Sequence, residues 1–173
     1  MKKVLLLIAL TCFLLPSVSN SQDNNVEQKL TTAGYLLYKG SKNLKLLRSD
    51  LAEVMKKSRD LNELDSLEMC HITMLMDNIL LVETICMYEG ILLGSIPNID
   101  KGKILEQYKV HHSQLKEDIL KRLYLNYQGT QSCAINIDNK IILEFADRAK
   151  EQMQTTLRVI EEVIKILQSH INT

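Results

Sequence analysis

The chain has 173 residues, of which 21 are basic and 21 acidic, so its formal net charge at pH 7 is zero. Nucleic-acid-binding domains normally carry a net basic face, and this balance argues against such a partner. Only six Gly and two Pro residues occur. After the first nineteen residues the chain is rich in Leu, Ile, Lys, Glu and Met, which mostly favour helices. We therefore expect an all-α protein.

The N-terminus has the composition of a secretory signal peptide. Two lysines precede the apolar run VLLLIALTCFLL, and Pro16 and the small-residue site SVS follow it, an order typical of an exported chain. The run is shorter than the ~20 apolar residues that span a bilayer, and we expect no later run to reach that length. We predict a signal peptide over 1–19 and one mature domain over 20–173, located in the periplasm or secreted, with no membrane span.

The first helix is predicted over about 25–59. Small or apolar residues recur there at alternating intervals of four and three, which is typical of a helix packed nearly parallel to its neighbours. These residues are Val26, Leu30, Ala33, Leu37, Gly40, Leu44, Leu47, Leu51, Val54 and Ser58. Gly34 and Gly40 disfavour a helix interior, so either a neighbour approaches closely there or the helix bends.

The second helix is predicted over about 62–93, with Asp60 or Asn62 as its cap. From Ile79 onward nearly every face of this helix is apolar, so it is either buried or packed against a partner. The stretch 94–98, GSIPN, indicates a stop and a turn. Gly90 and Gly94 are spaced like a helix-packing motif, but we interpret them as part of this turn or cap.

The third and fourth helices are predicted over about 100–127 and 137–171. Gly129 occupies a position suited to a C-terminal cap, the loop TQSCAIN follows, and Asn136 or Asp138 is a candidate cap for the last helix. The inner stripe of the third helix comprises Leu105, Tyr108, His112, Leu115, Ile119 and Leu123. That of the fourth comprises Ile142, Ala146, Ala149, Met153, Leu157, Ile160, Ile164, Leu167 and Ile171.

Short connections between helices of similar length favour antiparallel neighbours. The sequence therefore predicts an antiparallel up-down-up-down four-helix bundle after the signal peptide. The charges fit this order, because the acidic second helix lies between two basic ones.

Three cysteines lie beyond the signal peptide, and oxidising compartments favour disulfides. Cys70 and Cys86 are sixteen residues apart on one helix, about 24 Å along its axis, which is too far for a bridge. Folding the third helix back along the second brings Cys70 toward Cys133. We therefore predict a Cys70–Cys133 disulfide, with Cys86 either a buried thiol or a link to another chain.

One cluster has the residue types of a soft-metal site. Cys70, His71 and Met74 share one arc of the second helix, and sulfur with imidazole suits copper(I). His71 is also a candidate axial ligand for haem. Packed core is the simpler interpretation of these residues, and a bridged Cys70 has no free thiolate, so we assign no cofactor. His112 is interpreted as a core histidine.

No catalytic constellation is found, and we expect a protein that is not an enzyme. The favoured function is an exported protein-binding or structural accessory module, whose partner is an unidentified protein or a second copy of itself. Its contact surface is expected on the acidic second helix or on apolar surface left exposed after folding. The alternative is a carrier of a small ligand or of copper or haem, which uses the bundle interior near Cys70, His71 and Met74.

Overall fold

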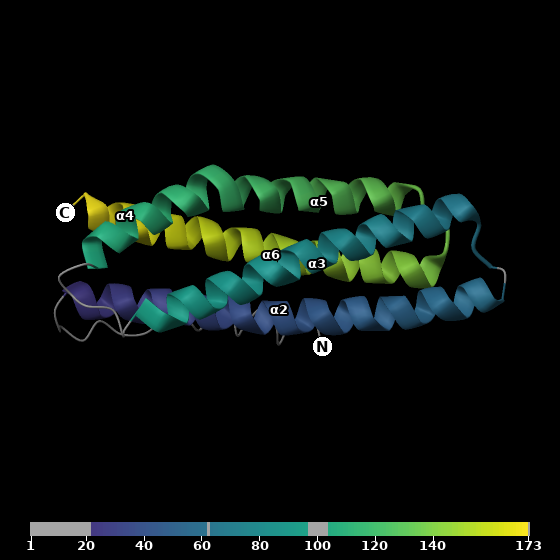
Figure 1. Cartoon of the computed structure of the whole chain (residues 1–173), viewed down its shortest axis with the longest axis horizontal. Coiled ribbons are helices and arrows are strands. Elements are labelled where there is room, and N and C mark those ends of the chain that lie inside the picture. The colour runs from purple at the N-terminus through teal and green to yellow at the C-terminus, as the bar shows by residue number, and fades with distance from the viewer. Residues whose placement is uncertain (1–21, 62, 97–103, 173) are drawn as a thin grey trace.

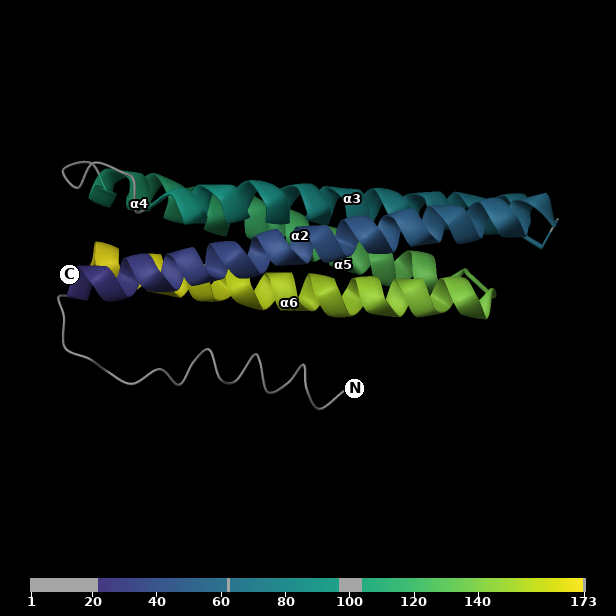
Figure 2. The same cartoon turned by 90° about the horizontal axis from the view of Figure 1, so that it is seen from below.

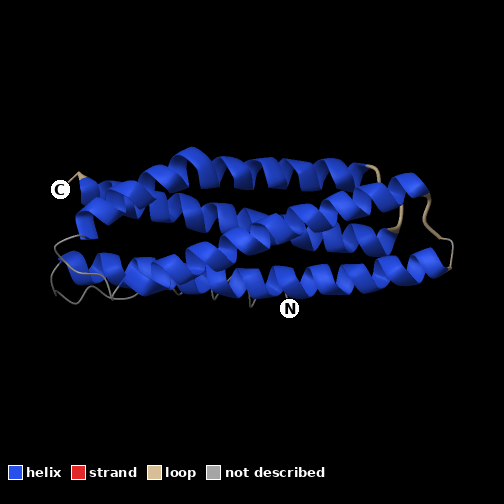
Figure 3. Cartoon of the chain, viewed as in Figure 1, coloured by secondary structure: helices blue, strands red, loops and turns tan. Residues whose placement is uncertain are grey.

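A computed structural model describes residues 22–61, 63–96 and 104–172, and within these ranges the chain is almost entirely helical, without strands. Figure 3 shows helices joined by short loops. The all-α expectation is therefore confirmed. The predicted signal peptide, the candidate cap Asn62 and most of the turn before the third helix lie outside the described residues.

Four helical rods make up the described part of the chain. They are α2 (Gln22–Asp60), α3 (Ser66–Ser95), a continuous run of α4 (Ile104–Gln114), η2 (Leu115–Ile119) and α5 (Leu120–Ile135), and α6 (Lys140–Ile171). Figure 1 shows the rods side by side, and the colour runs forward along α2, back along α3, forward to α5 and back along α6. In the view of Figure 2, α3 and α6 lie on opposite edges, while α2 and α5 each pack against both of them.

The rods bury their apolar stripes against one another. On α6 the buried positions recur every three or four residues, at Ile142, Ala146, Ala149, Met153, Thr156, Leu157, Ile160, Val163 and Leu167. Its opposite face is polar, as expected of a helix with one side in water. Most of the stripe predicted for α2 is also buried, from Leu30 to Leu51. Helix α2 runs without interruption through both of its glycines.

Helices α2 and α3 touch backbone to backbone. A Cβ added to Gly34 would lie 2.9 Å from the Gly94 nitrogen, and one added to Gly90 would lie 2.8 Å from the Tyr38 nitrogen and 2.9 Å from the Gly34 oxygen. Only glycine permits this approach. The interpretation of Gly90 as part of a turn is therefore wrong: it lies inside α3 at the closest contact with α2. The backbone of Gly94 takes part in the same contact, but a Cβ added to Gly94 itself would meet nothing within 4 Å.

Three helix ends differ from the sequence predictions. Helix α3 is capped by Asp65, whose side chain accepts a hydrogen bond from the Glu68 amide. Gly129 is not a cap, because α5 continues to Ile135 and the Asn78 side chain occupies the space beside that glycine. The cap of α6 is Asn139, whose side chain accepts hydrogen bonds from two backbone amides.

A π-helical turn joins α4 to α5. It spans Leu115–Ile119, and the Leu120 amide donates to the Leu115 carbonyl, five residues back. Leu115 and Leu123 are both buried although they are eight residues apart. Two turns of a regular α-helix span about seven residues, so this stretch contains one residue more than two turns need. The wider turn takes up the extra residue and keeps both leucines facing inward.

Helix α3 is long and apolar enough to cross a membrane when judged by length and composition alone. The expectation that no later segment reaches that size is therefore wrong. Only 28% of the residues in its most apolar window are buried within the protein. A core helix passes the same test, so this finding by itself assigns no membrane span.

Candidate functional site

The predicted metal-binding cluster does not face the interior as a unit. Cys70 is exposed, Met74 is 50% exposed, and only His71 is half-buried. The Nδ1 atom of His71 is buried, and no described residue forms a hydrogen bond with it. Within the described ranges, no group of three or more His, Cys, Asp or Glu residues is placed to hold a metal ion. Two of the three residues lie on the outer surface of α3, so the cluster does not line the bundle interior as the alternative carrier function would need.

The predicted disulfide is also absent, since Cys70, Cys86 and Cys133 are free thiols. Contacts of Asn78 with Gly129 in α5, and of Glu68 with Asp138 in the loop after α5, set the register of α3 against this rod. This register places Cys133 about one helical turn, or ~5 Å, from the level of Cys70. Cys70 also faces solvent, whereas Cys133 is 2% exposed. Burial raises the pKa of the Cys133 thiol, and the charge that Cys70 gains on ionisation raises it further.

A buried contact between a carboxyl group and an imidazole joins the inner face of α3 to α4. Glu89 is completely buried, and its Oε2 lies 3.2 Å from Nε2 of His111. The contact lacks hydrogen-bond geometry: among the described residues, neither Glu89 oxygen and not the Nε2 atom of His111 has a hydrogen-bond partner. An enclosed carboxylate requires a partner, because burial of an unpaired charge is costly. The contact with Glu89 is made by His111. His112, the residue predicted for the inner stripe, is half-buried like His111, and its Nε2 atom is enclosed as well.

One turn before Glu89, the thiol of Cys86 contacts α6. Its Sγ lies 3.3 Å from Thr156 Oγ1. Because Thr156 donates its hydroxyl proton to the Gln152 carbonyl, the Cys86 thiol is the donor in the hydrogen bond between the two side chains. The pKa of Cys86 is raised to about 11, mainly because the thiol is buried. The hydrogen bond with Thr156 lowers this pKa, and the charge of Glu89 raises it by a smaller amount. The group is a protonated, inert thiol at neutral pH.

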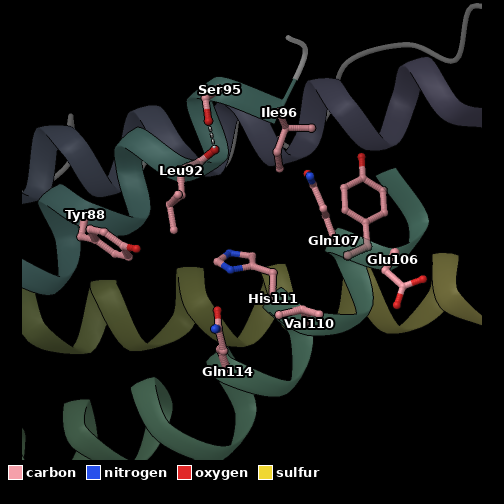
Figure 4. A pocket seen from close by; sticks show the side chains of 10 residues that line it. Tyr88, Leu92, Ser95, Ile96, Glu106, Gln107, Val110, His111 and Gln114 are labelled. Atoms are coloured by element: carbon pink, nitrogen blue, oxygen red, sulfur yellow. Dashed lines mark hydrogen bonds between the residues drawn. The ribbon is translucent and has the colours of Figure 1, made fainter. Parts of the chain in front are cut away.

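An open groove lies beside the Glu89–His111 contact, between the C-terminal part of α3 and α4. Its volume is about 310 Å³. Figure 4 shows the His111 ring at its centre, with Tyr88 and Leu92 on α3 on one side and Gln114 of its own rod on the other. The walls are mostly apolar, and Gln107 and Glu106 stand at the rim. Tyr88 belongs both to this groove and to the outer surface of α3.

The outer surface of α3 is the largest departure from an ordinary bundle helix. Eight exposed residues follow one another at alternating intervals of four and three, and we call them the outer seam: Cys70, Met74, Asp77, Leu81, Thr84, Tyr88, Ile91 and Ser95. Four of these side chains are large and apolar and are 50–60% exposed. Asp77 is the one charged residue of the seam. Glu83 lies off the seam and pairs with Arg48 of α2, 3.0 Å away.

The sequence pattern indicated that α3 has a contact surface but did not indicate which face of the helix carries it. The apolar residues around its whole circumference indicated a buried or partnered helix, and the structure separates an inner stripe from the outer seam. The Glu89–His111 pair was missed altogether. Its residues are 22 positions apart on different rods, and only an isolated acid within an apolar stretch marked one of them in the sequence.

Comparisons with known proteins give no relative: no family model, no curated protein and no solved structure matches this chain.

Proposed function

We propose that this chain is an exported, non-enzymatic accessory protein that binds another protein through the outer seam of α3. The functional unit is an antiparallel up-down-up-down four-helix bundle that presents this seam as a stiff, straight surface. The observation that carries the proposal is the exposed apolar content of the seam, flanked by Leu80 and Met87, which are 41% and 46% exposed. Contiguous apolar surface of this kind marks interaction sites.

The form of the seam supports a helical partner. Its four-three spacing is that of a coiled-coil stripe, in which side chains of one helix insert between those of another. Both faces of α3 carry this spacing, since the inner stripe includes Ile72, Leu75, Ile79, Val82 and Cys86. The inner stripe is used by the other rods, and the outer one stays available to a further helix.

The export half of the proposal rests on the pattern of residues 1–19. We expect the protein purified from the cells that produce it to begin near Asn20 and to occur in the exported fraction. N-terminal sequencing of that fraction measures both. An intact Met1 on cytosolic protein would overturn this half and leave the binding half untouched.

The binding half is tested with a photo-reactive amino acid placed at Leu81, with Arg158 on the outer face of α6 as the matched control position. Both side chains are exposed, so neither replacement disturbs the interior. Illumination of the producing cells is expected to yield covalent adducts from position 81 and not from position 158, with the partner identified by mass spectrometry. Equal labelling at both positions, or none at either, would contradict the proposal.

A further inference from the structure

We propose that the partner of the outer seam is a second copy of this chain, whose own outer seam lies antiparallel to the first. This inference rests on the proposed function, because it concerns the same face. It adds the identity of the partner, the direction of pairing and the residue contacts. The resulting dimer is isologous, so the same patch meets itself across a twofold axis.

The spacing of the seam is the same in both directions. Reading from Cys70 to Ser95 gives intervals of 4-3-4-3-4-3-4, and reading backward gives the same series. A twofold axis between Val82 and Glu83 therefore pairs all eight positions without a gap. The four kinds of pair are Cys70 with Ser95, Met74 with Ile91, Asp77 with Tyr88, and Leu81 with Thr84 of the second copy.

Charge selects the antiparallel direction. In a parallel, in-register pair the two Asp77 carboxylates would face each other, and like charges at such positions repel. In the antiparallel pair each Asp77 meets Tyr88 of the second copy, whose hydroxyl donates a hydrogen bond to the carboxylate. The single charge of the seam thus gains a partner twice, once in each half of the interface.

The composition of the flanks fits the same partner. The segment 63–96, which comprises α3 and the residues next to its two ends, contains six acids and no Lys or Arg. The five other acids lie off the seam; Glu83 is held by Arg48 and Glu89 is buried. Leu80 and Met87 border the seam instead, so the contact surface is apolar at its edge as well. An apolar seam with one self-complementary polar pair matches its own copy better than a charged partner.

The first test measures the mass of the purified protein in solution by sedimentation equilibrium. We expect a monomer–dimer equilibrium within about 1–100 µM. Leu81→Glu replaces an apolar side chain of the interface with a charged one in each of the two copies. Because apolar contact is lost and a charge is placed in the interface, the dissociation constant is expected to rise at least ~100-fold. Thr155→Glu, at an exposed position on α6, is the control and leaves the constant unchanged. Circular dichroism checks that both variants fold.

The second test fixes the register. Two proteins are prepared in which Cys12 and Cys70 are replaced by serine, one carrying Leu81→Cys and the other Thr84→Cys. Oxidation with glutathione disulfide is expected to link the two proteins to each other in a mixture, because residues 81 and 84 lie opposite. Each protein alone should form few dimers, whereas a parallel seam would link 81 to 81 and overturn the proposed direction.

Other outcomes separate this inference from the proposed function. Protein that remains a monomer at about 100 µM overturns the self-pairing. If photo-reactive residue 81 then labels a different protein, the proposed function stands and only the identity of the partner is wrong. If monomeric protein instead binds vesicles of neutral lipid, and Leu81→Glu abolishes that binding, the seam contacts a lipid surface and both proposals fail.

Discussion

Helices α3 and α6 occupy diagonally opposite positions and differ most on their outward faces. At the eight corresponding outward positions of α6, from Glu144 to Ser169, six residues are charged. On α3 only Asp77 is. Their inward faces differ in the opposite sense, because α3 buries a carboxylate and a thiol among its apolar residues. A helix that packs only within its own chain normally carries polar residues on its outer face, whereas α3 carries exposed apolar ones.

The largest expected effect comes from the inner face of α3. His111→Leu leaves the Glu89 carboxylate enclosed without its partner, and we expect it to lower the free energy of unfolding by about 3–5 kcal/mol. The double variant Glu89→Leu/His111→Leu is expected to recover wild-type stability or exceed it, which would make this face resemble the inner face of α6. Urea titration measures both. A single variant that costs under ~1 kcal/mol would contradict the assignment.

The contact between α2 and α3 is expected to be the next most sensitive. Gly90→Ala places a methyl group against backbone atoms of α2 that are 2.8–2.9 Å away, so the helices must separate. We expect a loss of about 1–3 kcal/mol of stability. Gly94→Ala is the matched control on the same helix: its Cβ meets nothing within 4 Å, and a gain of up to ~1 kcal/mol is expected from helix propensity. Thermal unfolding of the pair compares them directly, and equal losses would show that backbone contact is not the cause.

A smaller effect follows from the buried thiol. The pKa of Cys86 is raised to about 11 from 9.0, so its stabilising contribution is fully present below pH 9 and is lost as the pH rises toward 11. Over that interval the unfolded chain ionises first and the contribution falls by on the order of 2 kcal/mol. The difference in unfolding free energy between the wild type and Cys86→Ala, measured at pH 8 and pH 10.5, isolates this group from other titrating residues. A difference that does not change with pH would refute the raised pKa.

The smallest effect is expected on the outer seam. In dilute protein, Leu81→Gln should change the free energy of unfolding by no more than ~0.5 kcal/mol, because the side chain is exposed in the single chain. By contrast, truncation of a buried residue on the inner face of α6, Ile160→Ala, should lower the free energy of unfolding by about 2–5 kcal/mol. Denaturant titration of both variants sharpens the contrast between the two helices. A large loss for Leu81→Gln would mean that this leucine is already covered within one chain.

The sequence predicted best where one physical effect decides the structure. A single apolar stripe and a polar opposite face define α6, and its predicted span of 137–171 differs from Lys140–Ile171 only at the start. The inner positions of α3 were harder to predict, because apolar residues on every side give no preferred face. Only the packing of the other three rods separates its inner stripe from the outer seam.

The errors arose where contacts between rods override local preference. Gly129 has the residue type of a helix end, but the Asn78 amide from α3 fills the space beside it and α5 continues. Gly90 looked like part of a turn for the same reason, although a neighbouring backbone requires it. The Glu89–His111 pair depends on the register of α3 against α4, which no pattern within either segment specifies.

The widened turn at 115–119 has a consequence for how this chain tolerates changes in length. Removing one residue from the middle of an ordinary helix rotates everything beyond it by about 100° and exposes its core face. Here the third rod already carries one residue in excess, and Lys116, Glu117 and Asp118 all point into solvent. Deletion of any one of them would tighten the turn to a regular spacing while Leu115 and Leu123 keep their places, so this rod has a built-in site for length variation.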